Sequence, residues 1–374
     1  MIRLKLMGNN MGLFDGFRKE RLVKMAHKLF YQGRYSEALD CYDQIIEIDS
    51  NHAEVWYGKG AVLENLKMYE EALRCYDKAI DLDPNYGNAW EGKAIVLFEL
   101  GWPDEAFKCF DKALAVDPTI PSFWFNKGLA FANLDRFNEA LGCYDKALEL
   151  DPNYGEAWNN KGAVFRRLDE YDKALKCFDK KLIINPKDSV AWYNKGFALG
   201  KLGKFQEEIK SYDKALKIDP YFSSAWNNKG DALNKLGHYQ EALECFDKAI
   251  EINTGYGYAW NNKGDVLNKL GHYQEALECF DKAIEINNGY GYAWFNKGLS
   301  LAGLGSYKEA IECFDKAIEI DPDDVETWCN KGDVLKKLEK YQEALKCFDK
   351  ALELKPDFEP ALKAKKEILR KRFN

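Results

Sequence analysis

Nine tryptophans recur at a constant interval of 34 residues, and this spacing limits the fold more than any other feature of the sequence. A length of 374 residues would by itself suggest about two or three globular domains. A fixed period without insertions instead predicts an array of similar small units, each stacked on its neighbours. The periodic residues are Trp56, Trp90, Trp124, Trp158, Trp192, Trp226, Trp260, Trp294 and Trp328.

Each period carries the pattern of two helices. In residues 257–290, Trp260, Gly264 and Leu267 follow the i, i+4, i+7 spacing of one helix face. A second apolar stripe runs from Tyr273 to Ile284. A glycine between the stripes recurs in six periods, where a left-handed residue ends a helix. A proline near the end of seven periods stops the second helix before the next begins.

The recurring pattern W-x-x-K-G-x-x-L, then A-x-x-x-[YF]-x-x-A and a closing proline, resembles the tetratricopeptide repeat family. The resemblance implies an all-α, right-handed α-α superhelix of ten helical hairpins with a C-terminal capping helix. We number the positions of each unit from 1 to 34 and call its two helices helix A and helix B. The expected segments are an N-terminal arm (1–18), ten units (19–52, 53–86, 87–120, 121–154, 155–188, 189–222, 223–256, 257–290, 291–324 and 325–358) and a basic capping helix (359–374).

Composition and motifs argue against several functions. The net charge is 54 − 61 = −7, which provides no basic field for nucleic acid. No apolar run reaches the roughly 20 residues of a membrane span, and the start lacks the pattern of a secretory signal, so we expect a cytoplasmic protein. Nine of ten cysteines share position 23, which predicts reduced, part-buried thiols. No catalytic or metal-binding motif occurs, so we expect no enzyme activity, cofactor, metal or small-molecule substrate.

The variable residues of helix A are the candidates for binding. Positions 2, 5, 6, 9, 12 and 13 share the face opposite the buried stripe. In the family this face lines a concave groove that holds peptides. Exposed aromatic residues beside arginine are typical of binding hot spots, and asparagine can both donate to and accept from a peptide backbone. The candidate groove residues are Tyr57, Phe98, Phe125, Asn126, Leu129, Asn160, Arg166, Arg167, Tyr193, Asn194, Phe197, Lys201, Asn227, Asn228, Asp231, Asn261, Asn262, Asp265, Phe295, Asn296 and Asn330.

A structural role is the alternative for many of these positions. The asparagines at position 6 either contact a ligand or brace the neighbouring helix, and the aromatic residues either face a ligand or pack between helices. For Lys at position 7 and Asp at position 25, we expect an ion pair within the stack. Position 5 holds no lysine and position 9 no asparagine, so the clamp by which some relatives hold the carboxyl end of chaperones is not expected.

The leading hypothesis is a scaffold that binds a protein or peptide partner of unknown identity. The alternatives are an RNA-binding helical repeat and self-association through the nearly identical units 7 and 8. The arm either covers the edge of unit 1 or anchors the chain to a partner or membrane surface, and translation starts at Met1 or Met11. Nothing in the sequence explains Glu208 or Lys181, which stand where other units have small residues.

Overall fold

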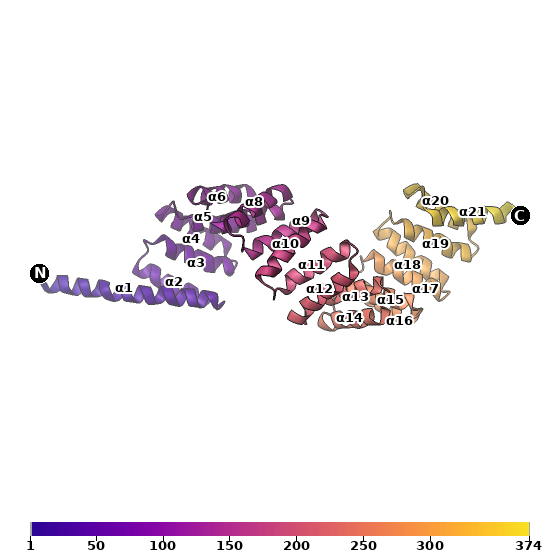
Figure 1. Cartoon of the computed structure of the whole chain (residues 1–374), viewed down its shortest axis with the longest axis horizontal. Helices are drawn as coiled ribbons and strands as arrows, with labels where there is room; N and C mark the ends of the chain where they lie inside the picture. The colour runs from indigo at the N-terminus through magenta and orange to yellow at the C-terminus, as the bar shows by residue number, and fades with distance from the viewer. Residues whose placement is uncertain (1, 374) are drawn as a thin grey trace. The chain divides into compact units, whose positions relative to one another are not determined.

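The computed structural model describes the backbone of residues 2–373 and the side chains of residues 17–370. The chain divides into an N-terminal half, residues 1–184, and a C-terminal half, residues 185–374, and each is described by itself. Within each half the helices follow one another as antiparallel hairpins in chain order (Figure 1). This all-α arrangement of consecutive hairpins confirms the fold expected from the sequence.

The helices repeat with the period of the sequence. Helix A of the units after the first has 13 residues and helix B has 14. The N-terminal half contains α1 (Ile2–Tyr31), α2 (Tyr35–Ile48), α3 (Ala53–Asn65), α4 (Tyr69–Leu82), α5 (Gly87–Glu99), α6 (Pro103–Val116), α7 (Pro121–Asn133), α8 (Phe137–Leu150), α9 (Gly155–Arg167) and α10 (Tyr171–Ile184). The C-terminal half contains α11 (Ser189–Lys201), α12 (Phe205–Ile218), α13 (Ser223–Lys235), α14 (Tyr239–Ile252), α15 (Gly257–Lys269), α16 (Tyr273–Ile286), α17 (Gly291–Gly303), α18 (Tyr307–Ile320), α19 (Val325–Lys337), α20 (Tyr341–Leu354) and α21 (Glu359–Phe373).

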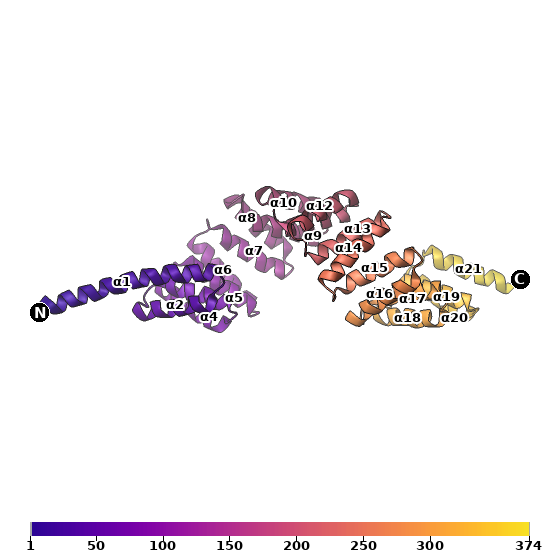
Figure 2. The ribbon, with the colours of Figure 1, turned by 90° about the horizontal axis from the view of Figure 1, so that it is seen from below.

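The first helix is longer than the expected helix A of unit 1. It begins at Ile2 and runs without interruption through the segment expected to be a separate arm. No proline occurs in this stretch to stop it. Its N-terminal part extends past the end of α2 (Figure 2). Phe17 is 69% exposed, whereas the side chains of Leu13 and Phe14 lie outside the described residues.

Each hairpin is held by an aromatic ring at position 24 against a small residue at position 8. A Cβ atom added to Gly264 would lie 2.6 Å from the ring of Phe280, which is fully buried. Alanines at positions 20 and 27, such as Ala276 and Ala283, are also fully buried beside the ring. The small residues therefore set the close approach of the helices, and the ring fills the space between them.

The loop between helix A and helix B has the same backbone in every unit. Six glycines at position 15 have φ between +73° and +82°. The other four units place a non-glycine residue there with φ between +58° and +61°, namely Lys67, Asp135, Asp169 and Glu339. The loop geometry is therefore kept even where the residue is unfavourable in the left-handed region.

The periodic tryptophans are half-buried and join their units to the preceding loop. In all nine, the indole Nε1 donates to the backbone carbonyl six residues earlier, at 2.8–3.1 Å. The acceptor belongs to proline in most units, but to Ser50, Thr254 and Asn288 in three.

Ion pairs connect helix A of one unit to helix B of the unit before it, as expected. The Nζ atom of Lys263, for example, lies 2.6 Å from Oδ1 of Asp247. The same pairing joins Lys59–Asp43, Lys93–Asp77, Lys127–Asp111, Lys161–Asp145, Lys229–Asp213, Lys297–Asp281 and Lys331–Asp315. Seven of these eight lysines also lie beside a tryptophan ring, with Nζ of Lys263 5.9 Å from the centroid of Trp260, and Lys127 lies beside Phe131.

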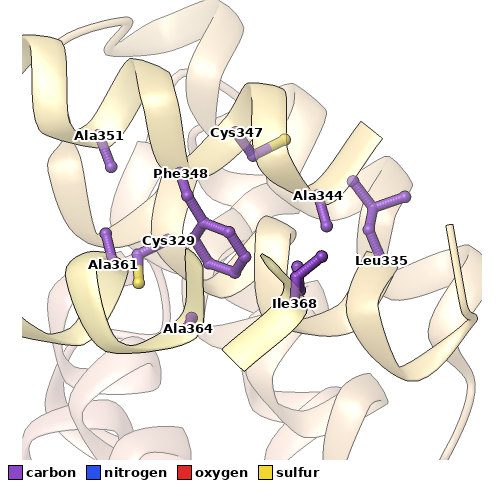
Figure 3. Close-up of a cluster of buried hydrophobic side chains, with 9 residues drawn as sticks. All are labelled: Cys329, Leu335, Ala344, Cys347, Phe348, Ala351, Ala361, Ala364 and Ile368. Carbon is purple, nitrogen blue, oxygen red and sulfur yellow. The ribbon is translucent and has the colours of Figure 1, made fainter. Parts of the chain in front are cut away.

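The last helix closes the core of the C-terminal half. Ala361, Ala364 and Ile368 of α21 point toward Phe348 of α20, and all four are buried (Figure 3). Lys363, Lys366 and Arg370 are exposed. One face of α21 therefore completes the stack and the other carries charge, as a terminal unit requires.

Candidate binding site

The predicted helix A face forms an aromatic pocket in the N-terminal half. The pocket has a volume of about 320 Å³. Its lining comes from α1, α2, α3 and the loop after α4, and includes one of the candidate groove residues, Tyr57. The lining residues are His27, Phe30, Tyr31, Tyr42, Glu54, Tyr57, Gly58, Ala61 and Tyr86.

A second pocket, of about 430 Å³, lies in the C-terminal half between units 8 and 9. It includes the candidate residue Phe295, at position 5 of α17. Two exposed tyrosines at position 2 border it, with Tyr258 59% and Tyr292 71% exposed. The full lining is Tyr258, Gly289, Tyr290, Gly291, Tyr292, Phe295, Ala317, Ile320, Asp321 and Asp324. We call this the Phe295 pocket.

The aromatic residue at position 5 is usually covered by another at position 34. The ring centroids of Tyr57 and Tyr86 lie 5.4 Å apart. The corresponding distances are 5.0 Å for Phe125–Tyr154 and 4.8 Å for Tyr193–Phe222. These three candidates are half-buried, as Phe295 is, and each presents only part of its ring to a ligand. Unit 9 differs because Asp324 occupies position 34 beside Phe295.

Most asparagines at position 6 bond to helix A of the preceding unit. Nδ2 of Asn126 donates to Oε1 of Glu91 at 2.9 Å. Asn228, Asn262 and Asn296 donate in the same way to position 5 of the unit before them. Asn160 and Asn330 instead donate to a backbone carbonyl of their own helix, and Asn194 is buried. Four of these seven side chains therefore brace the neighbouring helix, which is one of the two roles expected from the sequence.

In the C-terminal half these contacts join into one chain of amides. Nδ2 of Asn296 donates to Asn261, whose Nδ2 lies 3.4 Å from Oδ1 of Asn262. Asn262 donates to Asn227, which donates to Asn228, each at 3.1 Å. Asn228 ends the chain by donating to the hydroxyl of Tyr193. Asn227 and Asn261 are buried, so these bonds satisfy amides that would otherwise lose their hydration.

The charged candidates are also engaged with neighbouring residues. Arg167 pairs with Asp135, and its guanidinium carbon lies 4.7 Å from the ring centroid of Phe137. Nζ of Lys201 lies 5.5 Å from the ring of Phe197. Asp231 and Asp265 form ion pairs with lysines one turn later in their helices, Lys235 and Lys269. Of the remaining candidates, Arg166 lies in the last turn of α9, and Phe98 and Leu129 are half-buried.

The two residues that the sequence left unexplained are each accommodated by a glycine. A Cβ on Gly200 would lie 2.4 Å from Oε1 of Glu208, and one on Gly155 would lie 3.0 Å from Nζ of Lys181. Lys181 is 6% exposed, and its ammonium group lies 3.1 Å from Oε1 of Glu156. Glu208 is 5% exposed, and burial raises its pKa to about 7, while nearby Lys235 opposes the shift.

Several sequence models of the tetratricopeptide repeat match the chain. One matches residues 53–86, 121–154, 189–222, 291–324 and 325–358. Others match residues 221–286, residues 75–108 and 143–176, and residues 26–67. The chain belongs to the tetratricopeptide repeat family. No curated protein matches it significantly.

Solved structures of other tetratricopeptide repeat proteins resemble this one. A tetratricopeptide repeat protein from Parabacteroides merdae has a TM-score of 0.55 at 18% identity, over 67% of this chain and 98% of that one, which shows a shared fold. YrrB, described as a TPR protein with an unusual peptide-binding site, aligns at 31% identity and TM-score 0.42, over 50% of this chain and 97% of its own. Yeast Tom70 aligns at 15% identity and TM-score 0.47, over 95% of this chain and 96% of its own.

The thiols of this tetratricopeptide repeat protein lie in the packed interior. All ten cysteines are free and buried. Burial raises the pKa of the Cys75 thiol to about 11, so it is neutral near pH 7. Among the side chains that the structure describes, no three His, Cys, Asp or Glu residues are grouped to hold a metal ion. None of the helices in that part of the chain is both long and apolar enough to cross a membrane.

The sequence candidates omit three exposed tyrosines of this repeat protein's helix A face, namely Tyr31 at position 13 and Tyr258 and Tyr292 at position 2. Position 2 lies on the predicted face, but Tyr258 and Tyr292 were not singled out. The signal was present, because position 2 is tyrosine in units 8 and 9 only. Asp324 also departs from the commonest residue type, because position 34 is aromatic in six units and acidic only in units 5 and 9, as Asp188 and Asp324.

Proposed function

We propose that this chain is a non-catalytic scaffold that binds a segment of a partner protein on its helix A faces. The observation that supports this most is the Phe295 pocket, where exposed tyrosine rings border a cavity lined by positions 2 and 5. Large exposed rings bury much apolar area on binding and lose little conformational entropy, which suits a recognition surface. Membership of a repeat family with a variable helix A face agrees with this role.

The pocket of the N-terminal half provides a second contact surface of the same kind. Its lining is also aromatic, and positions 2, 5, 6 and 9 of α3 contribute to it. The regular frame of each half supports these faces on helices rather than on loops, which favours a preformed site. Ten free thiols suit a reducing compartment, so we place the scaffold in the cytoplasm.

Site-specific photocrosslinking tests the proposal. A benzophenone amino acid replaces Tyr258 in one variant and the exposed Glu312 of α18, outside the pocket lining, in a matched control. Both full-length variants are irradiated in native lysate, and crosslinked peptides are identified by mass spectrometry. We expect partner segments to be captured at position 258 and not at 312. Equal capture at both positions, or capture at neither, would reject binding on the helix A face.

A further inference from the structure

In the Phe295 pocket, an aspartate stands at position 34, where six of the ten units have an aromatic residue. Position 34 holds tyrosine in units 2, 4, 7 and 8 and phenylalanine in units 6 and 10. In three units with an aromatic residue at both positions, the two rings lie 4.8–5.4 Å apart between centroids. Asp324 has no ring to place against Phe295, and its carboxylate lines the pocket instead.

Two carboxylates of the pocket retain the capacity to bind a ligand. Asp324 caps α19, because its Oδ1 accepts from the backbone N–H of Glu326 at 3.1 Å and its Oδ2 from the hydroxyl of Thr327. Oδ1 of Asp321 accepts from the backbone N–H of Asp323 at 3.1 Å. A carboxylate offers about four lone-pair sites, so these bonds hold each group in place without saturating it.

The aromatic part of the pocket offers ring faces to a cation. The centroid of Tyr290 lies 5.0 Å from that of Tyr258 and 6.3 Å from that of Tyr292, and both pairs meet edge to face. Tyr258 and Tyr292 are more than half exposed, which leaves ring surface free. A guanidinium or ammonium group over such a face gains about 0.5–2 kcal/mol.

The charge of the lining has a single sign. The residues that line the pocket include two aspartates and no lysine or arginine. The nearest acidic neighbours in sequence, Asp323 and Glu326, are exposed and add to the negative potential. Aromatic faces and carboxylates without a competing cation favour a positively charged guest over a neutral or acidic one.

We propose that the Phe295 pocket binds an arginine side chain of a partner peptide, with the guanidinium group between the tyrosine rings and the carboxylates of Asp321 and Asp324. This inference rests on the proposed function and specifies the ligand chemistry at one of its sites. Arginine suits the pocket better than lysine because its planar group stacks on rings and also donates in pairs to carboxylates.

The probes are two blocked pentapeptides that differ at one residue. One has arginine between glycines, and the other has citrulline, which keeps the shape but lacks the charge. Binding to the full-length protein is measured by ligand-observed NMR. We expect the arginine peptide to bind about tenfold more tightly than the citrulline peptide. Equal affinities, or tighter binding of citrulline, would overturn the inference.

Two variants locate the binding site. Asp324→Asn removes the charge but keeps a residue that caps helices well, so the fold is retained. Asp324→Tyr introduces the residue found in units 2, 4, 7 and 8 and replaces the carboxylate of the lining with an aromatic ring. Both should lose the preference for arginine, whereas Asp323→Asn, an exposed neighbour outside the lining, should keep it. Retained preference in the two Asp324 variants would reject this pocket as the site.

The outcome separates this inference from the proposed function. Photocrosslinking at position 258 without a preference for arginine would reject the arginine site and leave the scaffold function standing. Absence of crosslinking together with a clear arginine preference would support the pocket chemistry and count against capture of a protein segment.

Discussion

Gly200 and Glu208 fit each other across the hairpin of α11 and α12. A Cβ atom at residue 200 would lie 2.4 Å from Oε1 of Glu208, closer than non-bonded atoms approach. Positions 12 and 20 hold alanine together in units 4 and 9, as Ala132 with Ala140 and Ala302 with Ala310. Unit 6 therefore exchanges a pair of small residues for one glycine and one buried carboxylate.

This exchange predicts a coupled pair of substitutions. Gly200→Ala should destabilise the protein by about 1–3 kcal/mol, because the added methyl group displaces Glu208. The double variant Gly200→Ala/Glu208→Ala recreates the alanine pair of units 4 and 9 and should recover that loss. Chemical denaturation of the wild type, both single variants and the double variant measures the coupling. Additive effects would show that the two residues do not constrain each other.

The raised pKa of Glu208 predicts that stability falls as pH rises toward neutrality. Its pKa moves from an ordinary value of 4.5 to about 7, since burial disfavours the charged form. The folded state thus holds the proton more tightly than the unfolded state. The stability that this proton adds is fully present below about pH 4.5 and is lost as the pH rises through about 7. The free energy of unfolding should decrease over this interval in the wild type. Glu208→Gln should show a smaller decrease, and identical pH profiles would contradict the assignment.

The non-glycine residues at position 15 are predicted sites of stabilisation. Lys67 has φ of 59°, in a region that side chains with a Cβ atom occupy at a cost. Lys67→Gly should raise the free energy of unfolding by up to about 1 kcal/mol. As the reverse control, Gly237→Ala, at the same position of unit 7 with φ of 80°, should lower it by about 1 kcal/mol. Thermal melts should show a higher midpoint than the wild type for Lys67→Gly and a lower one for Gly237→Ala.

The amide chain predicts different costs for two asparagines at the same position of their units. Asn262 donates to Asn227 and lies 3.4 Å from the Nδ2 donor of Asn261, so Asn262→Ala leaves buried partners unsatisfied. We expect a loss of about 1–3 kcal/mol. Asn330 donates to the backbone carbonyl of Glu326 in its own helix, which stays within the helix, and Asn330→Ala should cost about 0.5 kcal/mol or less. Equal losses in urea denaturation would argue against a special role for the chain of amides.

The sequence predicts the helices of each unit and the residues packed between them well, because both recur with the 34-residue period. Trp260, Gly264 and Phe280 each recur at a fixed position, so their burial and spacing can be inferred from the period alone. The pairing of Lys263 with Asp247 also follows from recurrence, and it is confirmed. Local rules of helix period and capping are sufficient for these features.

The candidate site is less predictable, because its shape depends on departures from the repeat. Whether Tyr57 or Phe295 is open to a ligand depends on what position 34 places beside it. The bond from Asn262 to Asn227 likewise depends on the distance between two helices, which no pattern within one helix gives. Helix A periodicity identifies a shared face, but contacts between units decide which of its side chains remain available.

The tryptophan contact with the preceding loop uses only the main chain of its acceptor. Trp260 and Trp294 bond to the carbonyls of Thr254 and Asn288 at 3.1 and 2.9 Å, much as other tryptophans bond to proline. The side chain at that junction takes no part in this hydrogen bond, so its identity can vary without breaking the bond. Units joined in this way are interchangeable parts, so duplication or recombination of whole units preserves their connection without compensating changes in sequence.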